Sequence, residues 1–240
     1  MTTSLSGART GAARLAALAS LAADETRAGF LLALLDGRAW TAGELARHAG
    51  VAASTASEHL GKLVAGGLLA EERQGRHRYV RLADARVAQL VEDLAAQVSP
   101  TAAARPRTLR EAGAGSAMAR GRTCYDHLAG RLGIAVTDAL TGLGLLRQDT
   151  GFALTDEGVN WFEGVGIPLV RTGQRPLARA CLDWTERRPH LAGIAGAALC
   201  QHALNANWCT RIGSERAVKV TEKGEQALSQ LLGIQADTLR

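Results

Sequence analysis

The sequence has few aromatic residues and no long apolar segment. Only 4% of its 240 residues are Phe, Trp or Tyr, which leaves little material for the stacking platforms that bind single-stranded nucleic acids. No stretch reaches the roughly 18 consecutive apolar residues of a transmembrane helix. Arg14 interrupts the Ala-rich stretch at residues 12–23, which argues against a signal peptide. We therefore expect a cytoplasmic protein with no membrane association.

Cysteine and proline are also scarce. The chain has 5 prolines and 4 cysteines, all of the cysteines in the second half and none in a Cys-x-x-Cys pair. A disulfide-stabilised fold is therefore not expected, and the thiols should be reduced. With 47% hydrophobic and 21% charged residues, the composition is typical of a soluble globular protein, and the length favours two domains.

The net charge is +5, but the excess is spread thinly. Residues 1–98 contain 11 Lys and Arg against 10 Asp and Glu, and the remainder 17 against 13. A polyanionic partner therefore has to be inferred from the position of the basic residues and not from the overall charge.

The first half has the pattern of a helix-turn-helix. Apolar residues at helical spacing predict helices over residues 11–23 and 27–35. Thr41, with Glu44 three residues later, forms a capping box that opens a short helix. A glycine-containing turn and a further helix over residues 53–65 follow, which is the order of elements in a helix-turn-helix.

Residues 68–82 consist of two extended segments on either side of Gln74-Gly75, with basic side chains near the tip. This pattern predicts a β-hairpin, the wing of a winged helix.

The segment TAGELARHAGVAASTASEHLGKLVAGGLLAEERQGRHRYVRL resembles the core of the ArsR family of transcriptional regulators. The resemblance covers residues 11–98. It implies a winged helix-turn-helix that binds double-stranded operator DNA as a homodimer and acts as a repressor. It also implies dimerisation through the first helix and the helix at residues 84–98, where four residues form an apolar face: Val87, Leu90, Val91 and Leu94.

The candidate DNA contacts fall into two groups. Short polar side chains on the helix at residues 53–65 are suited to base edges in the major groove, and basic side chains on this helix and the wing are suited to phosphates. The candidates for bases are Ser54, Thr55, Ser57 and His59, and those for phosphates are Lys62, Arg73, Arg76 and Arg78.

Some positions depart from the family pattern. Ala52 stands where a capping Ser or Thr is common, and Glu58 and Gly61 stand where polar or basic residues often contact DNA. The family's metal-binding cysteines are absent from residues 44–48, and its second metal site is absent from residues 84–98. Metal sensing is therefore not carried over to this half, and a winged helix used only for protein contacts is the alternative.

The second half contains an internal duplication. Residues 99–117 are expected to be a linker, and residues 118–240 an effector domain made of two copies, at about 120–170 and 178–235. Residues 127–135 and 190–198 share six identities in nine positions, and a Thr-x-x-Gly follows in each copy. Each copy is expected to have helices followed by a hairpin and a helix, like a degraded winged helix. The fold class is therefore mainly α with small β-hairpins (α+β).

The repeated Cys-x-Asp, each followed by a His, is the sharpest chemical feature of this half. If the two copies meet, thiolate, imidazole and carboxylate groups gather at one site. A bound metal or metalloid ion, an organic or thiol-reactive effector, and a purely structural role are all open. The candidates are Cys124, Asp126, His127, Cys181, Asp183, Trp184 and His190.

The remaining cysteines, Cys200 and Cys209, are interpreted as core residues. The sequence requires no cofactor, and it contains no phosphate-binding glycine loop, nucleophile elbow or nucleotide fingerprint. We therefore expect a DNA-binding regulator and not an enzyme, with repression released by an effector in the second half. The alternatives are a regulator without a ligand and an enzyme that depends on Cys and His.

Overall fold

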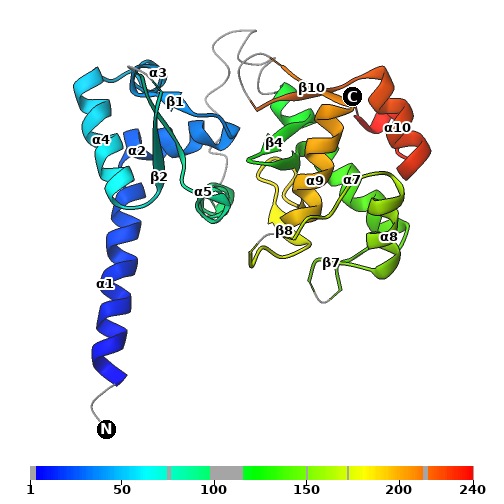
Figure 1. Cartoon of the computed structure of the whole chain (residues 1–240), viewed down its shortest axis with the longest axis horizontal. Coiled ribbons are helices and arrows are strands. Elements are labelled where there is room, and N and C mark those ends of the chain that lie inside the picture. Colours follow the sequence, from blue (N-terminus) through cyan, green and yellow to red (C-terminus); the bar gives the residue numbers. More distant parts are fainter. Residues whose placement is uncertain are drawn as a thin grey trace. The chain divides into compact units, whose positions relative to one another are not determined.

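The structure is a computed structural model, and its chain forms two compact units, Met1–Val91 (the N-terminal unit) and Glu92–Arg240 (the C-terminal unit) (Figure 1). The residues that it describes are 4–74, 77–97, 116–149, 151–171, 173–212 and 216–239. Most of the expected linker, as well as Arg76 of the expected wing, lies outside these ranges.

The first part of the chain is helical with one small sheet. Its elements are α1 (Ser4–Ala22), α2 (Glu25–Ala33), the 3-10 helix η1 (Leu34–Asp36), β1 (Trp40–Thr41), α3 (Ala42–Ala49), α4 (Ala53–Ala65), β2 (Leu69–Gln74), β3 (His77–Leu82) and α5 (Ala85–Gln97).

Local sequence signals explain where α3 and α4 begin. Thr41 Oγ1 accepts a hydrogen bond from the backbone N–H of Glu44, and a Glu44 carboxylate oxygen accepts one from the N–H of Thr41 at 2.7 Å. The predicted capping box is therefore present. α3 ends at Gly50, which has φ +65°, a conformation that favours glycine. α4 begins after Ala52, which makes no side-chain cap, as the sequence indicated.

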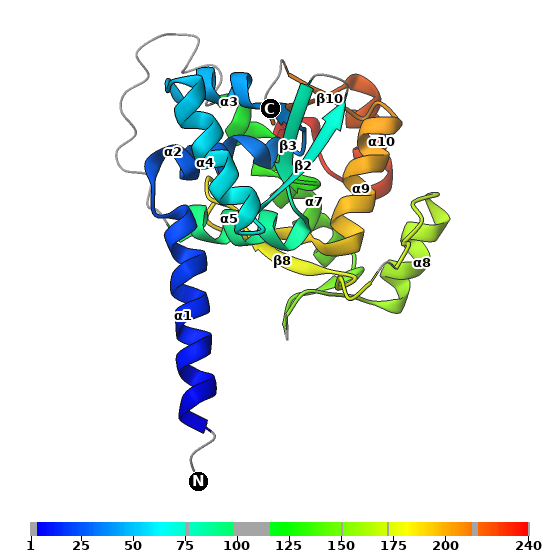
Figure 2. The ribbon, with the colours of Figure 1, turned by 60° about the vertical axis from the view of Figure 1, so that its left-hand side comes forward.

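The predicted wing is an antiparallel hairpin. β2 pairs with β3 in a register that runs from Leu69 opposite Leu82 to Gln74 opposite His77, and the two strands lie side by side in Figure 2. The short strand β1, which the sequence did not predict, pairs with β3 and makes a three-stranded sheet of order β1-β3-β2. β1 ends at Thr41, which is also the N-cap residue of α3, so the pairing of β1 with β3 connects the wing directly to the start of α3.

The C-terminal unit contains the same series of elements twice: hairpin, helix, hairpin, helix. The first copy has β4 (Arg122–Cys124), β5 (His127–Ala129), α7 (Gly130–Gly142), β6 (Leu146–Arg147), β7 (Ala153–Leu154) and α8 (Asp156–Gly164). The second copy has β8 (Arg179–Leu182), β9 (Pro189–Ala192), α9 (Gly193–Asn205), β10 (Cys209–Arg211), β11 (Val218–Val220) and α10 (Glu222–Leu232), and the 3-10 helix η2 (Ala236–Leu239) follows.

The fold class predicted from the sequence is confirmed, with one difference in the order of elements. In each copy a hairpin, β4-β5 or β8-β9, precedes the first long helix, so Cys124 and His190 lie on strands; a short helical segment at residues 116–120 comes before β4. In the first copy the chain reverses at Tyr125, which has φ +56°. A tight reversal between Cys124 and His127 places these residues opposite each other and leaves no room for a helix there.

The repeated Thr-x-x-Gly has the same structural role in both copies. Thr155 and Thr221 are the N-cap residues of α8 and α10, and each Oγ1 accepts from the N–H of the glycine three residues later at 3.0 Å. A Cβ at Gly224 would collide with the carbonyl oxygen of Trp208. The motif therefore combines a helix cap with a close approach of two backbones.

Both copies contribute to one hydrophobic core. Leu132, Leu140 and Phe162 from the first copy are buried in the same cluster as Leu199 and Leu228 from the second. Because the core is shared, neither copy buries its apolar face without the other.

Cys200 and Cys209 are in this core, as interpreted from the sequence. Burial raises the pKa of both thiols to about 12, so they remain protonated at neutral pH.

Candidate functional site

The exposed face of α4 carries short polar side chains. Ser54 and Ser57 are exposed and Thr55 is half-buried, whereas Leu60 and Leu63 are fully buried on the other side. Ser57 Oγ donates to the Ala53 carbonyl at 2.9 Å, a bond that still leaves the hydroxyl oxygen free to accept. The helix is thus held by its apolar face while its polar face is open.

His59 is placed differently from the other candidates on α4. Its side chain is only 15% exposed. Its Nδ1 lies 3.3 Å from Arg27 Nη1 and 3.6 Å from Asp24 Oδ1. Asp24 caps α2, so this histidine connects α4 to the start of α2.

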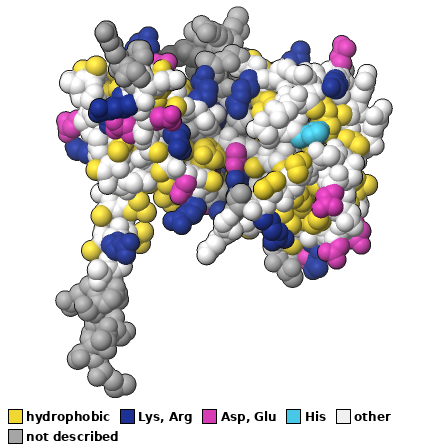
Figure 3. Space-filling view, in the orientation of Figure 1, with side chains coloured by type: hydrophobic (Ala, Val, Ile, Leu, Met, Phe, Trp, Pro, Cys, Tyr) yellow, Lys and Arg dark blue, Asp and Glu magenta, His cyan; other side chains and the backbone are white. Residues whose placement is uncertain are grey.

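Three cations of α4 and the wing are paired with carboxylates. Lys62 Nζ lies 2.7 Å from Glu58, and Arg78 and Arg73 lie 2.7 and 3.5 Å from Glu71. On the face that Figure 3 shows, basic and acidic side chains are interspersed over the described residues of the N-terminal unit. Exposed pairs of this kind contribute about 0–1 kcal/mol each, so phosphates can compete with the carboxylates for the cations.

The two Cys-x-Asp segments lie in corresponding hairpins of the C-terminal unit. Cys124 on β4 is opposite His127 on β5, and Cys181 on β8 is opposite His190 on β9. Residues directly opposite each other in an antiparallel pair project from the same face. Each hairpin therefore presents one thiol beside one imidazole.

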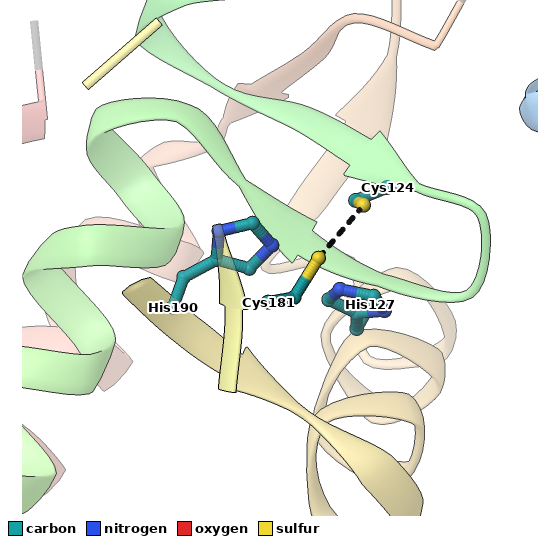
Figure 4. A group of neighbouring side chains, drawn as sticks. All are labelled: Cys124, His127, Cys181 and His190. Atoms are coloured by element: carbon teal, nitrogen blue, oxygen red, sulfur yellow. Dashed lines mark hydrogen bonds between the residues drawn. The ribbon is translucent and has the colours of Figure 1, made fainter. Parts of the chain in front are cut away.

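The hairpins bring the two Cys–His pairs together. The Sγ atoms of Cys124 and Cys181 are 3.6 Å apart, and the His127 and His190 ring centroids are 5.1 Å apart. One ligand atom from each of the four residues lies within 4.8 Å of all the others. Figure 4 shows the facing sulfur atoms with an imidazole on each side of Cys181. We call these four residues, all at most 4% exposed, the Cys–His centre.

The two aspartates lie behind the histidines and not among these four. Asp126 Oδ1 is 3.2 Å from His127 Nδ1, and Asp183 Oδ2 is 3.4 Å from His190 Nδ1. Both carboxylates thus face the Nδ1 side of a ring. Of the two cysteines, two histidines and two aspartates that the sequence offered as ligands, the aspartates are the two that lie outside the centre.

Each aspartate is also paired with an arginine. Arg175 makes two hydrogen bonds to Asp126, at 2.6 and 3.0 Å. Arg122, only 1% exposed, donates to Asp183 at 2.9 Å. Burial opposes ionisation of Asp183, but the charge of Arg122 outweighs it and holds the pKa of this carboxyl well below its usual range.

Trp184 lies over the buried ion pair. The Arg122 guanidinium carbon is 4.5 Å from the centroid of the Trp184 ring, the geometry of a cation–π contact. The tryptophan is half-buried, and the contact gives it a packing role against Arg122. Its role as the wall of a ligand pocket stays a prediction.

The thiols and imidazoles of the centre change each other's ionisation. A hydrogen bond from Cys124 and the two neighbouring imidazoles hold the pKa of Cys181 far below its usual range. Burial, together with Cys181, raises that of Cys124. Burial opposes the charged form of His127, but Asp126 and Cys181 outweigh it and raise the pKa of His127 to about 9. These shifts favour a thiolate at Cys181 beside a protonated His127.

Sequence reasoning did not identify Arg122 and Arg175. Arg122 is two residues before Cys124 in a buried strand, and a charged residue in such a strand indicates a buried partner of opposite sign. That signal is present in the sequence, but it does not indicate which carboxylate is the partner.

No helix within the ranges that the structure describes is long and apolar enough to cross a membrane.

Comparison with known proteins places the chain among transcriptional regulators. The family model of a helix-turn-helix domain matches residues 22–72. The chain is 40% identical over 223 residues to the HTH-type transcriptional regulator YdfF of Bacillus subtilis (strain 168), an alignment that covers 92% of this chain and 97% of YdfF. It is 36% identical over 104 residues to the HTH-type transcriptional regulator CmtR of Mycobacterium tuberculosis, covering 43% of this chain and 87% of CmtR.

Two solved structures are similar to part of the chain. The NMR structure of CmtR, described as a cadmium metal-sensor, is 39% identical, with a TM-score of 0.30, and the match covers 33% of this chain and 81% of that one. The homodimeric winged helix-turn-helix domain Mb0332 of Mycobacterium bovis is 26% identical, with a TM-score of 0.36, covering 39% of this chain and 86% of that one.

The helix-turn-helix, the wing and the similarity to YdfF over 92% of the chain define a DNA-binding transcriptional regulator of the winged-helix class. The chain belongs to the ArsR family of these regulators.

Proposed function

We propose that this regulator is a homodimeric repressor that occupies a palindromic operator and is released when an effector acts on its C-terminal unit. The observation that carries the proposal is the open polar face of α4 with Ser54 and Ser57, opposite the buried Leu60 and Leu63. A helix held rigidly by its apolar face can insert its polar face into the major groove, where hydroxyl groups bind base edges.

The wing supplies the phosphate contacts in this proposal. Arg73 is 79% exposed and Arg78 is 35% exposed, and both share Glu71 as their carboxylate partner. Residues 68–82 contain four arginines and two glutamates, so the wing has a net positive charge. Phosphates that replace Glu71 release condensed counterions, which makes operator affinity fall as salt rises.

A second copy of the chain is the proposed partner of α1. Leu15 is 68% exposed on this helix, and Figures 1 and 2 both show its N-terminal turns extending away from the other elements of its unit. On α5, Leu90 and Leu94 are 37% and 50% exposed. These side chains support burial against the same helices of a second copy, and a two-fold dimer reads two half-sites of a palindrome.

The effector site is proposed to lie at the Cys–His centre. Ionisable groups with strongly shifted pKa values in a buried cluster are more frequent at functional sites than elsewhere. The second candidate is a regulator without a ligand, in which the ion pair of Arg122 with Asp183 has a purely structural role. A catalytic role has no support from the relatives, which are named as transcriptional regulators.

The proposal is tested by titrating the full chain against duplex DNA from upstream of its own gene. Fluorescence anisotropy measures the binding at several salt concentrations. We expect tight, salt-dependent binding of one dimer per site, and much weaker binding to a shuffled duplex. A thiol oxidant and Zn²⁺ are then added separately. Equal affinity for both duplexes would overturn the operator proposal, and operator binding that neither additive changes would favour a regulator without such a ligand.

A further inference from the structure

We propose that the C-terminal unit binds one divalent metal ion of the zinc class, in a tetrahedral site of two sulfur and two nitrogen ligands that joins the two copies. The proposed ligands are Cys124, His127, Cys181 and His190. This site deepens the effector site proposed above, but metal binding itself depends only on the chemistry of these side chains and requires neither DNA nor a regulatory signal.

The distances fit a tetrahedral ion. With metal–sulfur bonds of about 2.3 Å and tetrahedral angles, two thiolate ligands are about 3.8 Å apart, and the Sγ atoms of Cys124 and Cys181 are 3.6 Å apart. The two imidazoles contribute nitrogens within 4.8 Å of both sulfur atoms. A disulfide would need the sulfur atoms to approach to about 2.05 Å.

Three of the four ring nitrogens in the Cys–His centre make no hydrogen bond to a nitrogen or oxygen atom of the described residues. These are Nε2 of His127 and both ring nitrogens of His190, and all three are buried. A buried polar atom without a partner is costly, and a metal ion at the centre of the four residues would satisfy one nitrogen on each ring.

The aspartates of the repeated Cys-x-Asp complete the site from behind. Asp126 faces Nδ1 of His127 at 3.2 Å, and Asp183 faces Nδ1 of His190 at 3.4 Å. A carboxylate on Nδ1 fixes the ring orientation and leaves Nε2 for the metal, as behind most metal-bound histidines. Asp126, which is hydrogen-bonded to Nδ1 of His127, is therefore a positioning residue. Asp183 lies near Nδ1 of His190, but its hydrogen bonds go to Arg122, Gly130 and Thr185.

The charges also fit a dication. Two thiolates balance the charge of a divalent ion, and the two imidazoles bind as neutral ligands. Thiolate and imidazole in equal number are a donor set for zinc-class ions and a poor one for Mg²⁺ or Ca²⁺, which prefer oxygen. Binding would connect residues 57 positions apart, Cys124 in the first copy and Cys181 in the second.

The first test uses the full-length wild-type chain, reduced and freed of metal with a chelator under anaerobic conditions, and titrated with Co²⁺ as a spectroscopic probe. We expect thiolate-to-cobalt charge-transfer bands and d–d bands of tetrahedral intensity that saturate at one ion per chain and disappear when Zn²⁺ is added. Bound Zn²⁺ should also slow the alkylation of Cys124 and Cys181. Bands of octahedral intensity, or no bands while the chain is folded, would overturn the proposal.

Variants then assign the ligands. Cys181→Ser and His190→Gln should each lower the affinity for Zn²⁺ by about 100-fold or more in competition with a chromophoric chelator, and Asp126→Asn by about 10- to 100-fold. Cys209→Ser, which changes a buried thiol in the core of the same unit, is the matched control and should leave the affinity unchanged. Circular dichroism of each metal-free variant identifies any that fails to fold.

An equal affinity for Zn²⁺ in Cys181→Ser and the wild-type chain would show that the ion binds elsewhere. Rapid formation of a Cys124–Cys181 disulfide when a thiol oxidant is added to a chain that binds no Co²⁺ would assign the centre to redox chemistry instead. Neither result bears on operator binding itself, because these assays contain no DNA; they bear only on the effector site proposed at the same centre.

Discussion

Arg122 and Asp183 form an ion pair with a 2.9 Å contact in which the two side chains are 1% and 0% exposed. Asp183 also accepts from the backbone N–H of Gly130 at 2.6 Å and from Thr185 Oγ1 at 2.7 Å. These bonds satisfy a carboxylate that burial would otherwise leave without solvation. The pair thereby joins the first hairpin of one copy to the first hairpin of the other, next to the Cys–His centre.

Breaking this ion pair should destabilise the C-terminal unit strongly. Arg122→Met leaves the Asp183 carboxylate buried without its cation, and we expect a loss of about 3–5 kcal/mol in the free energy of unfolding. Arg188→Met is the matched control, since Arg188 pairs with Asp138 at the surface with 56% of its side chain exposed, and it should cost less than about 1 kcal/mol. Urea denaturation measures both, and similar losses in the two variants would contradict a structural role for the pair.

The close approach at the Thr-x-x-Gly of the second copy should tolerate no side chain. Gly224→Ala would push a methyl group into the Trp208 carbonyl, and we expect a loss of about 1–3 kcal/mol or more. Gly142→Ala in α7 meets no atom within 4 Å, so it should be neutral or stabilise by up to about 1 kcal/mol, because alanine favours helix more than glycine does. Thermal unfolding followed by circular dichroism compares the two; an unchanged midpoint for Gly224→Ala would be inconsistent with the observed packing.

Removing the wing arginines should weaken operator binding without changing its sequence preference. Each phosphate contact contributes about 0.9 to the slope of log affinity against log salt. Arg73→Ala combined with Arg78→Ala should therefore reduce the slope of a dimer by up to about 3.6. The control is Arg147→Ala, an exposed arginine paired with Asp149 in the C-terminal unit. If the slope is the same in the wing variant, its arginines do not contact phosphates.

Removing the hydroxyl groups of the exposed α4 serines should weaken the sequence preference without changing the salt dependence of binding. Ser54→Ala and Ser57→Ala should each reduce the difference in binding free energy between operator and unrelated duplex by about 1–3 kcal/mol, with the salt slope unchanged. Ser229→Ala, at an exposed position of α10, is the control. Anisotropy titrations with both duplexes measure the difference, and full discrimination in the α4 variants would remove these residues from the base contacts.

The exposed leucine of α1 should control the oligomeric state. Leu15→Gln is expected to shift the chain from dimer toward monomer, because it places an amide in an apolar interface. Leu143→Gln, the control, alters a leucine that is 54% exposed in the C-terminal unit and should not change the proportion of dimer. Sedimentation velocity distinguishes the two states. A Leu15→Gln variant that remains dimeric would show that Leu15 is not essential to the dimer interface and leave α5 as the candidate.

Much of the DNA-binding half follows from local sequence signals. The capping box of Thr41 and Glu44, the helix over residues 53–65, the uncapped Ala52 and the hairpin that follows were all predicted, because helix caps, apolar spacing and turn residues act within a few positions of each other. β1 was missed because two residues are too short to show a pattern, and only pairing with β3 defines it.

In the C-terminal half, the sequence and the tertiary structure each decided different features. The sequence by itself determined the duplication, with its repeated Thr-x-x-Gly, and the residue types available to bind a ligand. Only the tertiary structure decided that Cys124 and Cys181 approach each other while Asp126 and Asp183 stay behind the histidines. The reason is that strand register assigns each side chain to a face, and the shared core of the two copies brings those faces together, neither of which depends on residue spacing alone.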